Sequence, residues 1–370
     1  GRSAGEIFMW DCSHNQSDVS MTEQRDGAQD GRFGAGVARR SFLKGGATAG
    51  TLAVAGCTGL GDNGGDGEES GAILIFHAGS LATPFEGAES QFEEETGINV
   101  EREPKGSVAS TQKITEQGRQ ASVLGVSDFR LIRNRIVPEF GDWYAILATN
   151  AMSIQYREDS TGAEDISKDN WWEVLSRDDV TIGHSDPAVD PGGYRAVMTQ
   201  QLGTESFQGE QLYDEATYQK LRENSVVPTG TETNLKGQLR SGELDYAFYY
   251  QSISSVTDLP SIDLQPEVDL SQASSEYASH YAKATVDTNS GSFEGAPIAY
   301  GITVPSVAPN PEGGARWIEY MIDGPGEEIL TESGLQPVNP TVVPEGGADA
   351  VPSNVMDAAE AQSNLGPLEL

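Results

Sequence analysis

The chain has 370 residues, of which 37% are hydrophobic and 22% charged, enough for two domains with hydrophobic cores. Asp and Glu number 57 against 23 Lys and Arg, and the resulting net charge of −34 argues against nucleic acid and anionic lipid as partners. Cys12 and Cys57 both lie in the N-terminal part, so the folded region has neither a disulfide framework nor a thiolate metal site. No apolar run is long enough to predict a membrane-spanning helix.

Residues 1–57 have the features of an export segment. The twin arginines Arg39 and Arg40 precede a weakly apolar segment rich in Gly and Ala, which resembles a twin-arginine signal. The following VAGC resembles a lipobox, in which Cys57 becomes the lipid-modified first residue of the mature protein. Residues 58–71 form a Gly-rich acidic linker that cannot pack. We therefore expect a protein held by lipid at the extracytoplasmic face of the cell membrane; a basic spot beside a small-residue loop is the alternative.

The stretch 72–92 predicts a strand, a tight turn and a helix. The apolar run 72–77 indicates a buried strand, and an apolar residue on each turn of the following segment predicts a helix over 81–96. Gly79 and Ser80 occupy the turn between them. The first N–H groups of that helix and its dipole would favour a negative charge there. The alternative is an ordinary strand-to-helix turn that Ser80 caps.

Strands and helices alternate over the rest of the chain, which favours α/β layers. Strands are predicted over 72–77, 98–103, 122–127, 180–185, 243–250, 261–265, 281–288 and 297–304, and helices over 81–96, 107–118, 194–202, 211–224, 232–240 and from about 313. The apolar run 143–156 is too long for an average strand and is interpreted as a strand that crosses between two lobes, with 243–250 crossing back. These two crossings form the hinge of a clamshell whose cleft holds the ligand.

The predicted domains follow from these crossings. Residues 72–152 form the first part of lobe 1 and residues 153–250 form lobe 2. Residues 251–345 complete lobe 1, and residues 346–370 are a tail with little to pack.

Three corners rich in Gly or Ser follow predicted strands: Gly79-Ser80, Gly106-Ser107 and Asp190-Pro191-Gly192-Gly193. Each offers backbone N–H groups together with a hydroxyl or a carboxylate. Such corners are suited to a compact oxyanion. Three of them on alternate strands are a more specific signal than one.

Seven blocks in order resemble one family: FHAGSL at 76–81, GSV at 106–108, SDF at 127–129, SDPAVDPGGYR at 185–195, TETNL at 231–235, LDYAFYYQS at 244–252 and YGITVP at 300–305. The family is that of the archaeal tungstate/molybdate-binding proteins of ABC importers, and the likeness runs from about residue 72 to about residue 343. It implies a two-lobed, type II periplasmic-binding-protein fold that acts as a monomer without catalysis or cofactor. Tungstate or molybdate would be the ligand, and an ABC permease and its ATPase the partners. The Asp-, Glu- and Gly-rich, Lys-poor composition also resembles that of halophilic, haloarchaeal proteins.

The resemblance also implies the site residues. Gly79, Ser80 and Ser107 would donate hydrogen bonds to oxo groups, the backbone of Pro191 and Gly192 would lie beside the ligand, and Tyr250 would offer its hydroxyl. In this family two carboxylates complete a six-coordinate metal, and by motif they are Asp190 and Glu232. A high-valent metal is a hard acid that carboxylate oxygens suit, whereas the same carboxylates repel sulfate or phosphate, which have no vacant coordination position.

The sequence departs from the family at Gly192, where the family usually has Cys, and at Gln251, where it has a basic residue. A backbone contact survives the first change, and the second removes a positive charge.

Alternatives remain for each assignment. Asp190 can be a helix N-cap before Pro191, Glu232 an acid at a helix start, and Tyr250 a residue that fills the hinge. The same clamshell could hold sulfate or phosphate instead. An anchored hydrolase or a structural surface protein is a third possibility, although no G-x-S-x-G or H-E-x-x-H motif occurs from residue 72 onward.

Overall fold

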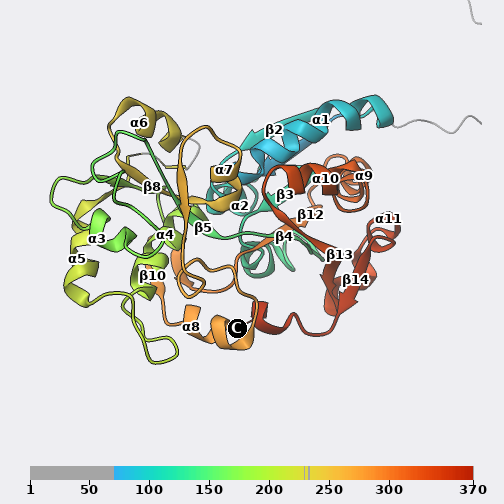
Figure 1. Ribbon diagram of the computed structural model, residues 1–370. Coiled ribbons are helices and arrows are strands. Elements are labelled where there is room, and N and C mark those ends of the chain that lie inside the picture. Colours follow the sequence, from blue (N-terminus) through green and yellow to red (C-terminus); the bar gives the residue numbers. More distant parts are fainter. Residues whose placement is uncertain (1–70, 229, 232–233, 370) are drawn as a thin grey trace, which may run out of the picture. The chain divides into compact units, whose positions relative to one another are not determined.

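The structure, a computed structural model, describes residues 71–228, 230–231 and 234–369, all within the unit Gly65–Leu370 (Figure 1). The seven-stranded sheet of the first lobe has the order β14 (Ala359–Gln362), β13 (Gln336–Pro344), β4 (Ala145–Thr149), β12 (Ala299–Thr303), β3 (Val123–Val126), β1 (Ile73–His77) and β2 (Val100–Pro104). β1 pairs in parallel with β2 and β3, so the carboxyl ends of these strands share one edge.

The second lobe contains the five-stranded sheet. Its order is β7 (Ser225–Val226), β6 (Ile182–Gly183), β8 (Tyr246–Tyr250), β5 (Met152–Tyr156) and β9 (Ser261–Asp263). β6 and β8 are parallel, and their carboxyl ends also share an edge. A separate hairpin consists of β10 (Thr285–Thr288) and β11 (Gly291–Glu294).

The helices connect and cover these sheets. They are α1 (Ala82–Thr96), α2 (Ser107–Thr115), α3 (Trp171–Leu175), α4 (Pro191–Leu202), α5 (Glu215–Asn224), α6 (Leu235–Ser241), α7 (Gln251–Ser255), α8 (Ser275–Tyr281), α9 (Pro311–Asp323), α10 (Pro325–Glu332) and α11 (Ser353–Met356). Short 3-10 helices are η1 (Gly79–Leu81), η4 (Glu345–Ala350) and η5 (Gly366–Glu369), and η2 (Ile132–Ile136) is a π-helix.

The helical stripe predicted from the sequence forms part of the first core. Leu81, Phe85 and Phe92 are fully buried, and Trp317 of α9 packs edge-on against Phe85 and Phe92 with ring centroids 5.4 and 5.0 Å apart. α1 lies beside α10 in Figure 1 and contacts it. α2 and η2 contact each other and belong to the opposite face of the sheet, where Phe76 and Ile114 are buried in a second cluster. This sheet, covered on both faces, is a rigid support for the corners at its edge.

The apolar run 143–156 crosses between the sheets as predicted, but as two strands instead of one. β4 belongs to the first sheet and β5 to the second. Asn150 lies at the break, where its side-chain oxygen accepts the N–H groups of Ala151 and Ser252 at 2.9 and 3.2 Å. These bonds satisfy backbone N–H groups that have no strand partner where the chain crosses.

The prediction that 243–250 returns the chain to the first lobe is wrong. β8 lies between β6 and β5 in the second sheet, and β9 joins the same sheet through β5. All five residues of β8 are buried, as a central strand covered on both faces requires. The second lobe therefore extends past residue 250, and the chain rejoins the first sheet at β12.

The prediction that residues 346–370 offer little to pack is also wrong. β14 pairs in parallel with β13, so this segment adds the edge strand of the first sheet. Val355 and Leu365 are buried. The apolar residues of the segment are too widely spaced to form a recognisable helical or strand pattern.

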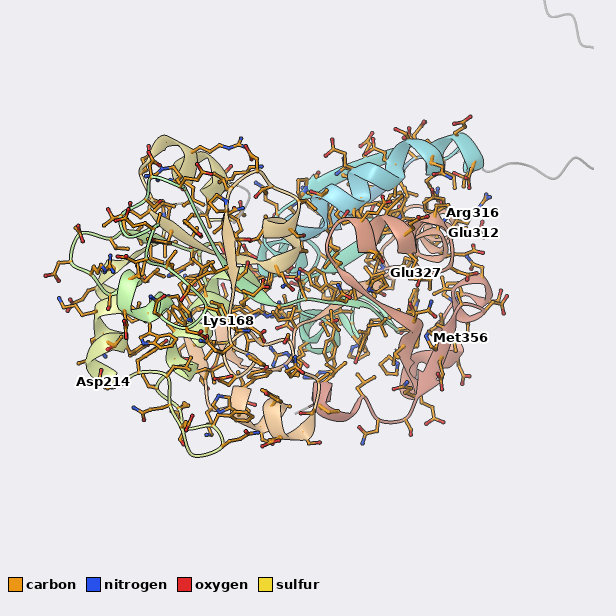
Figure 2. All side chains as sticks on the ribbon, viewed as in Figure 1. Lys168, Asp214, Glu312, Arg316, Glu327 and Met356 are labelled. Atoms are coloured by element: carbon orange, nitrogen blue, oxygen red, sulfur yellow. The ribbon has the colours of Figure 1, made fainter. Side chains whose placement is uncertain are left out.

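Charged side chains cover the outside of this unit. Figure 2 shows Lys168, Asp214 and Glu312 on the surface, and all three are exposed. None of the helices in the described part of the chain combines the length and the apolar character needed to cross a membrane.

Candidate functional site

The first predicted corner follows β1. Gly79 and Ser80 form the short helix η1, and Ser80 is 4% exposed. The Ser80 hydroxyl accepts a hydrogen bond from the Tyr300 hydroxyl at 2.8 Å, and Asn150 donates to the same Tyr300 oxygen at 3.0 Å. Ser80 is therefore connected to the residue at which the chain crosses between the lobes.

The second corner is tied to the end of β3. Gly106 precedes helix α2, and Ser107 is its first residue. The buried Ser107 hydroxyl accepts the Ser127 N–H at 3.0 Å and lies 3.1 Å from the Ser127 hydroxyl. Two strand ends of the first lobe thus place a pair of hydroxyl groups side by side.

The third corner belongs to the second lobe and begins helix α4. The Asp190 side chain accepts the Gly192 N–H at 3.3 Å, and Pro191 occupies the first helical position, so Asp190 has the geometry of an N-cap. Gly193 packs against the preceding segment, where a Cβ atom would lie only 2.3 Å from the Ser185 carbonyl oxygen. This tight packing holds Asp190, Pro191 and Gly192 in one buried corner.

The corners of the two lobes meet. A Cβ atom on Gly106 would lie 2.2 Å from the Val189 carbonyl oxygen and 2.9 Å from the Asp190 Cβ atom. The Ala109 N–H donates to the same Val189 carbonyl at 3.2 Å. The structure therefore brings the corner of Ser107 and the corner of Asp190 together, with the lobes closed at this point.

Tyr250 at the end of β8 joins the network from the second lobe. Its ring is buried, and its hydroxyl donates to the Ser127 hydroxyl at 3.3 Å and accepts from Arg195 at 2.8 Å. Its ring centroid lies 6.1 Å from that of Tyr300. Tyr250 thus links the partners of Ser107 and of Ser80, the two serines predicted for the site.

Two predicted residues, Glu232 and Cys57, lie outside the described residues. The neighbouring Gly230 is described, and a Cβ atom on it would lie 3.8 Å from a Val189 methyl group. Gly230 therefore lies beside Val189, the residue that precedes Asp190.

Gln251, noted as a departure from the family, does not point to this site. Its side chain donates to Asp263 of β9 at 2.8 Å, in an exposed position.

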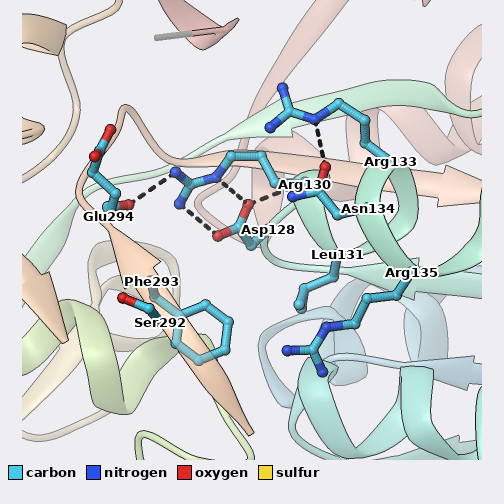
Figure 3. A pocket seen from close by; sticks show the side chains of 9 residues that line it. All are labelled: Asp128, Arg130, Leu131, Arg133, Asn134, Arg135, Ser292, Phe293 and Glu294. Carbon is cyan, nitrogen blue, oxygen red and sulfur yellow. Dashed lines mark hydrogen bonds and ion pairs between the residues drawn. The ribbon is translucent and has the colours of Figure 1, made fainter. Parts of the chain in front are cut away.

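The sequence analysis missed a buried ionic cluster next to the site. Arg130 forms an ion pair with the Asp128 carboxylate at 2.8 Å, and Arg195 of the other lobe lies 3.5 Å from the same carboxylate (Figure 3 shows the Arg130 pair). Burial opposes ionisation of Asp128, but the two guanidiniums outweigh it and hold its pKa below the usual range. Tyr194 also donates to Asp128, at 2.7 Å. The signal was present in the sequence, because Asp128 stands in the SDF block, Arg130 follows that block directly, and Arg195 ends the SDPAVDPGGYR block.

Each lobe has a buried histidine at the end of a strand that leads into a corner. His77 and His184 each direct Nδ1 to the carbonyl of the following residue at 2.8 Å, a geometry that requires the neutral ring to carry its hydrogen on Nδ1. Burial lowers the pKa of both to about 4, although the bonded carbonyl opposes this shift.

The sequence pattern of the bacterial extracellular solute-binding protein family matches residues 73–336. A protein of Petrotoga mobilis named an uncharacterized solute-binding protein is 38% identical over 307 residues, which cover 80% of this chain and 92% of that protein. The molybdate/tungstate-binding protein WtpA of Pyrococcus abyssi is 34% identical over 316 residues, which cover 78% of this chain and 91% of that protein.

A solved structure shows the same fold. The periplasmic molybdate-binding protein of Azotobacter vinelandii is similar with a TM-score of 0.53 and 15% identity, over 71% of this chain and 98% of that chain. The predicted two-lobed α/β fold is confirmed by this likeness.

The two buried histidines predict a loss of stability in mild acid. Because the fold holds both rings neutral, the unfolded chain binds protons first as the pH falls below 6.5, the ordinary pKa. The histidine contribution is complete above pH 6.5 and is lost progressively toward pH 4. Each histidine should lower the free energy of unfolding by about 2 kcal/mol when the pH falls from 7.5 to 5.

Chemical denaturation at constant high salt measures this effect. The matched variants His77→Gln and His184→Gln lack the titrating group, so each should have a flatter dependence of unfolding free energy on pH than the wild type. Parallel profiles for the wild type and both variants would contradict the assignment.

Proposed function

Because this chain belongs to the bacterial extracellular solute-binding protein family, we propose that it captures tungstate or molybdate outside the cytoplasmic membrane for an ABC importer. The observation that carries this proposal is the meeting of the corners of Gly106 and Asp190, one from each lobe. A ligand between such corners contacts both lobes at once. The relative named molybdate/tungstate-binding protein supports the choice of ligand. The protein performs no catalysis in this proposal.

The proposed ligand contacts follow from the corners. Gly79, Ser80 and Ser107 donate to oxo groups, and Tyr250 adds its hydroxyl from the second lobe. The backbone of Pro191 and Gly192 lies alongside. These corners stand at the carboxyl ends of parallel strands, the usual place for a ligand in α/β sheets.

Asp190 and Glu232 are proposed to coordinate the metal of the oxyanion directly. Asp190 is buried at the point of contact between lobes, and Gly230 places the chain just before Glu232 near Val189. Carboxylates at this position select against sulfate and phosphate, whose central atoms accept no further ligand and whose charge the carboxylates repel.

The proposed mechanism is closure of the lobes on the ligand. The oxyanion contacts residues of both lobes only when they are closed, and this difference in contacts shifts the equilibrium toward the closed form. The chain crossing at Asn150 lies between the two sheets and is a suitable hinge. The closed form is then presented to the permease, which with its ATPase completes the importer.

We also propose that the twin-arginine segment exports the chain and that Cys57 anchors it by lipid at the extracytoplasmic face. The sequence pattern of residues 38–57 supports this part of the proposal. The acidic composition supports a halophilic, haloarchaeal source, in which salt screens the charges.

Substitution of Asp190 separates its role as a cap from its role as a ligand. Asparagine also caps helices, so Asp190→Asn should leave the unliganded protein's stability almost unchanged. It lacks the anionic oxygen, so tungstate affinity measured by calorimetry in high salt should fall by about 100-fold or more. Glu232→Gln should have a similar effect on affinity.

A remote cap is the control for this experiment. Asp214→Ala removes the N-cap of α5 and should lower stability slightly without changing tungstate affinity. Unchanged tungstate binding in both Asp190→Asn and Glu232→Gln, or equal affinity of the wild type for sulfate and tungstate, would overturn direct coordination.

Gly106→Ala tests closure. The added Cβ atom has no room against the Val189 carbonyl, so the lobes cannot close fully. The Ala109 amide lies in the first turn of α2 and bonds to Val189 across the lobes, so its hydrogen exchange reports closure. With saturating tungstate, the wild type should protect this amide at least about tenfold more than Gly106→Ala does.

Gly237→Ala is the matched control, because nothing lies within 4 Å of the added atom. Its Ala109 amide should be protected as in the wild type. Equal protection in the Gly106 variant would show that this contact does not define the closed state.

Cys57→Ser tests the anchor. In the native host, the wild type should sediment with membranes, and the variant should be found in the soluble extracytoplasmic fraction. Replacement of both Arg39 and Arg40 by Lys should leave the protein in the cytoplasm. Membrane association of the Ser variant equal to that of the wild type would refute lipidation at this cysteine.

A further inference from the structure

A buried cluster of two arginines and one aspartate lies beside the proposed oxyanion site. Arg130 and Arg195 both approach the Asp128 carboxylate, at 2.8 and 3.5 Å, and the side chains of Asp128 and Arg195 are 3% and 2% exposed. Figure 3 shows Arg130 between Asp128 and the Glu294 backbone, whose carbonyl it also binds. Two guanidiniums and one carboxylate leave this cluster with a net charge of +1.

Arg195 extends this charge toward the site. One of its nitrogens donates to the Tyr250 hydroxyl at 2.8 Å and to the Ser127 carbonyl at 2.7 Å. Tyr250 is a proposed ligand residue, and the Ser127 hydroxyl is paired with Ser107, a second one. Arg195 also lies in α4, the helix that begins at Asp190. The Arg195 guanidinium therefore contacts Tyr250 directly. Ser127 connects it to Ser107, and helix α4 connects it to Asp190.

The proposed complex brings several negative charges together, so a positive charge nearby would stabilise it. A dianion held by two carboxylates places four negative charges together, in a chain whose net charge is already −34. Like charges held this close in a protein repel strongly, because the effective dielectric constant there is well below that of water. Hydroxyl and amide donors carry no net charge, so they cannot offset repulsion of this size alone.

We propose that Arg195, held in the cluster with Asp128 and Arg130, is the counter-charge of the oxyanion site and positions the Tyr250 hydroxyl. This inference rests on the proposed function and names a residue through which affinity is set. Because the Tyr250 oxygen accepts from Arg195, its single hydrogen is the group it can donate, to Ser127 or to an oxo group.

The test compares Arg195→Gln with Arg195→Lys by calorimetry with tungstate in high salt. Gln removes the charge, so affinity should fall by about 30-fold or more. Lys keeps the charge without the planar fork, so it should restore most of this loss, to within about fivefold of the wild type. Equal losses in both variants would overturn the counter-charge and indicate a packing role, and no loss in either would overturn the inference altogether.

A second variant keeps the test decisive if Arg195→Gln does not fold. Arg130→Gln leaves the Tyr250 contact intact and reduces the cluster to zero net charge, and it should lower tungstate affinity by about three- to tenfold. Unchanged affinity in this variant would contradict the charge argument. Circular dichroism and the melting temperature of each unliganded variant verify folding.

Two controls separate charge from other effects. Tyr194→Phe removes a hydrogen bond to Asp128 between the lobes without changing charge, and it should lower affinity less than Arg195→Gln. Arg157→Gln removes another largely buried guanidinium, one that binds the Leu239 carbonyl, and should lower stability alone. A wild type that binds no oxyanion overturns the proposed function itself, whereas tight binding unaffected by the Arg195 variants overturns this inference only.

Discussion

The close approach of two backbones, at Gly106 and at Val189, is the constraint on which the arrangement of the site depends. No side chain fits between them, so each corner is brought within reach of the other lobe's polar groups. Helices α2 and α4 both begin here, which places their positive dipole ends together. Two such ends repel each other unless negative charge lies between them. The Asp190 carboxylate supplies part of that charge, and an anionic ligand would supply more.

This constraint makes the cap role of Asp190 compatible with its proposed role as a ligand. As an N-cap, its side chain accepts the Gly192 N–H, which fixes the carboxylate at the start of the helix and orients it. The same fixed orientation is what a metal ligand needs, because a preorganised group loses little entropy on binding. The two interpretations of Asp190 left open by the sequence therefore do not exclude each other. Tyr250 is similar, since it is both a buried aromatic residue and a member of the hydroxyl network.

Local patterns in the sequence were enough to predict β1, the tight turn at Gly79 and Ser80, and α1, because each depends on residues within a few positions. The sheet position of β8 was not predictable in this way, because the partners β5 and β6 come from distant parts of the chain. The cluster of Asp128 and Arg195 has the same origin: 67 positions separate residues that meet only through lobe closure. In a very acidic chain, the sequence alone predicts that a charged residue lies on the surface. Only a contact in the structure shows that such a residue is buried.

The position of β14 has a consequence for self-association. β14 covers the outer edge of β13, whose N–H and C=O groups would otherwise be open along one side of the first sheet. An open edge of this kind is a template on which a strand of a neighbouring molecule can add. β14 is short and partly exposed, so its own outer edge is a poor template for the addition of another strand. Proteolytic removal of the residues after Pro344 would thus convert a protected sheet into one prone to edge-to-edge aggregation, even though every proposed ligand residue would remain.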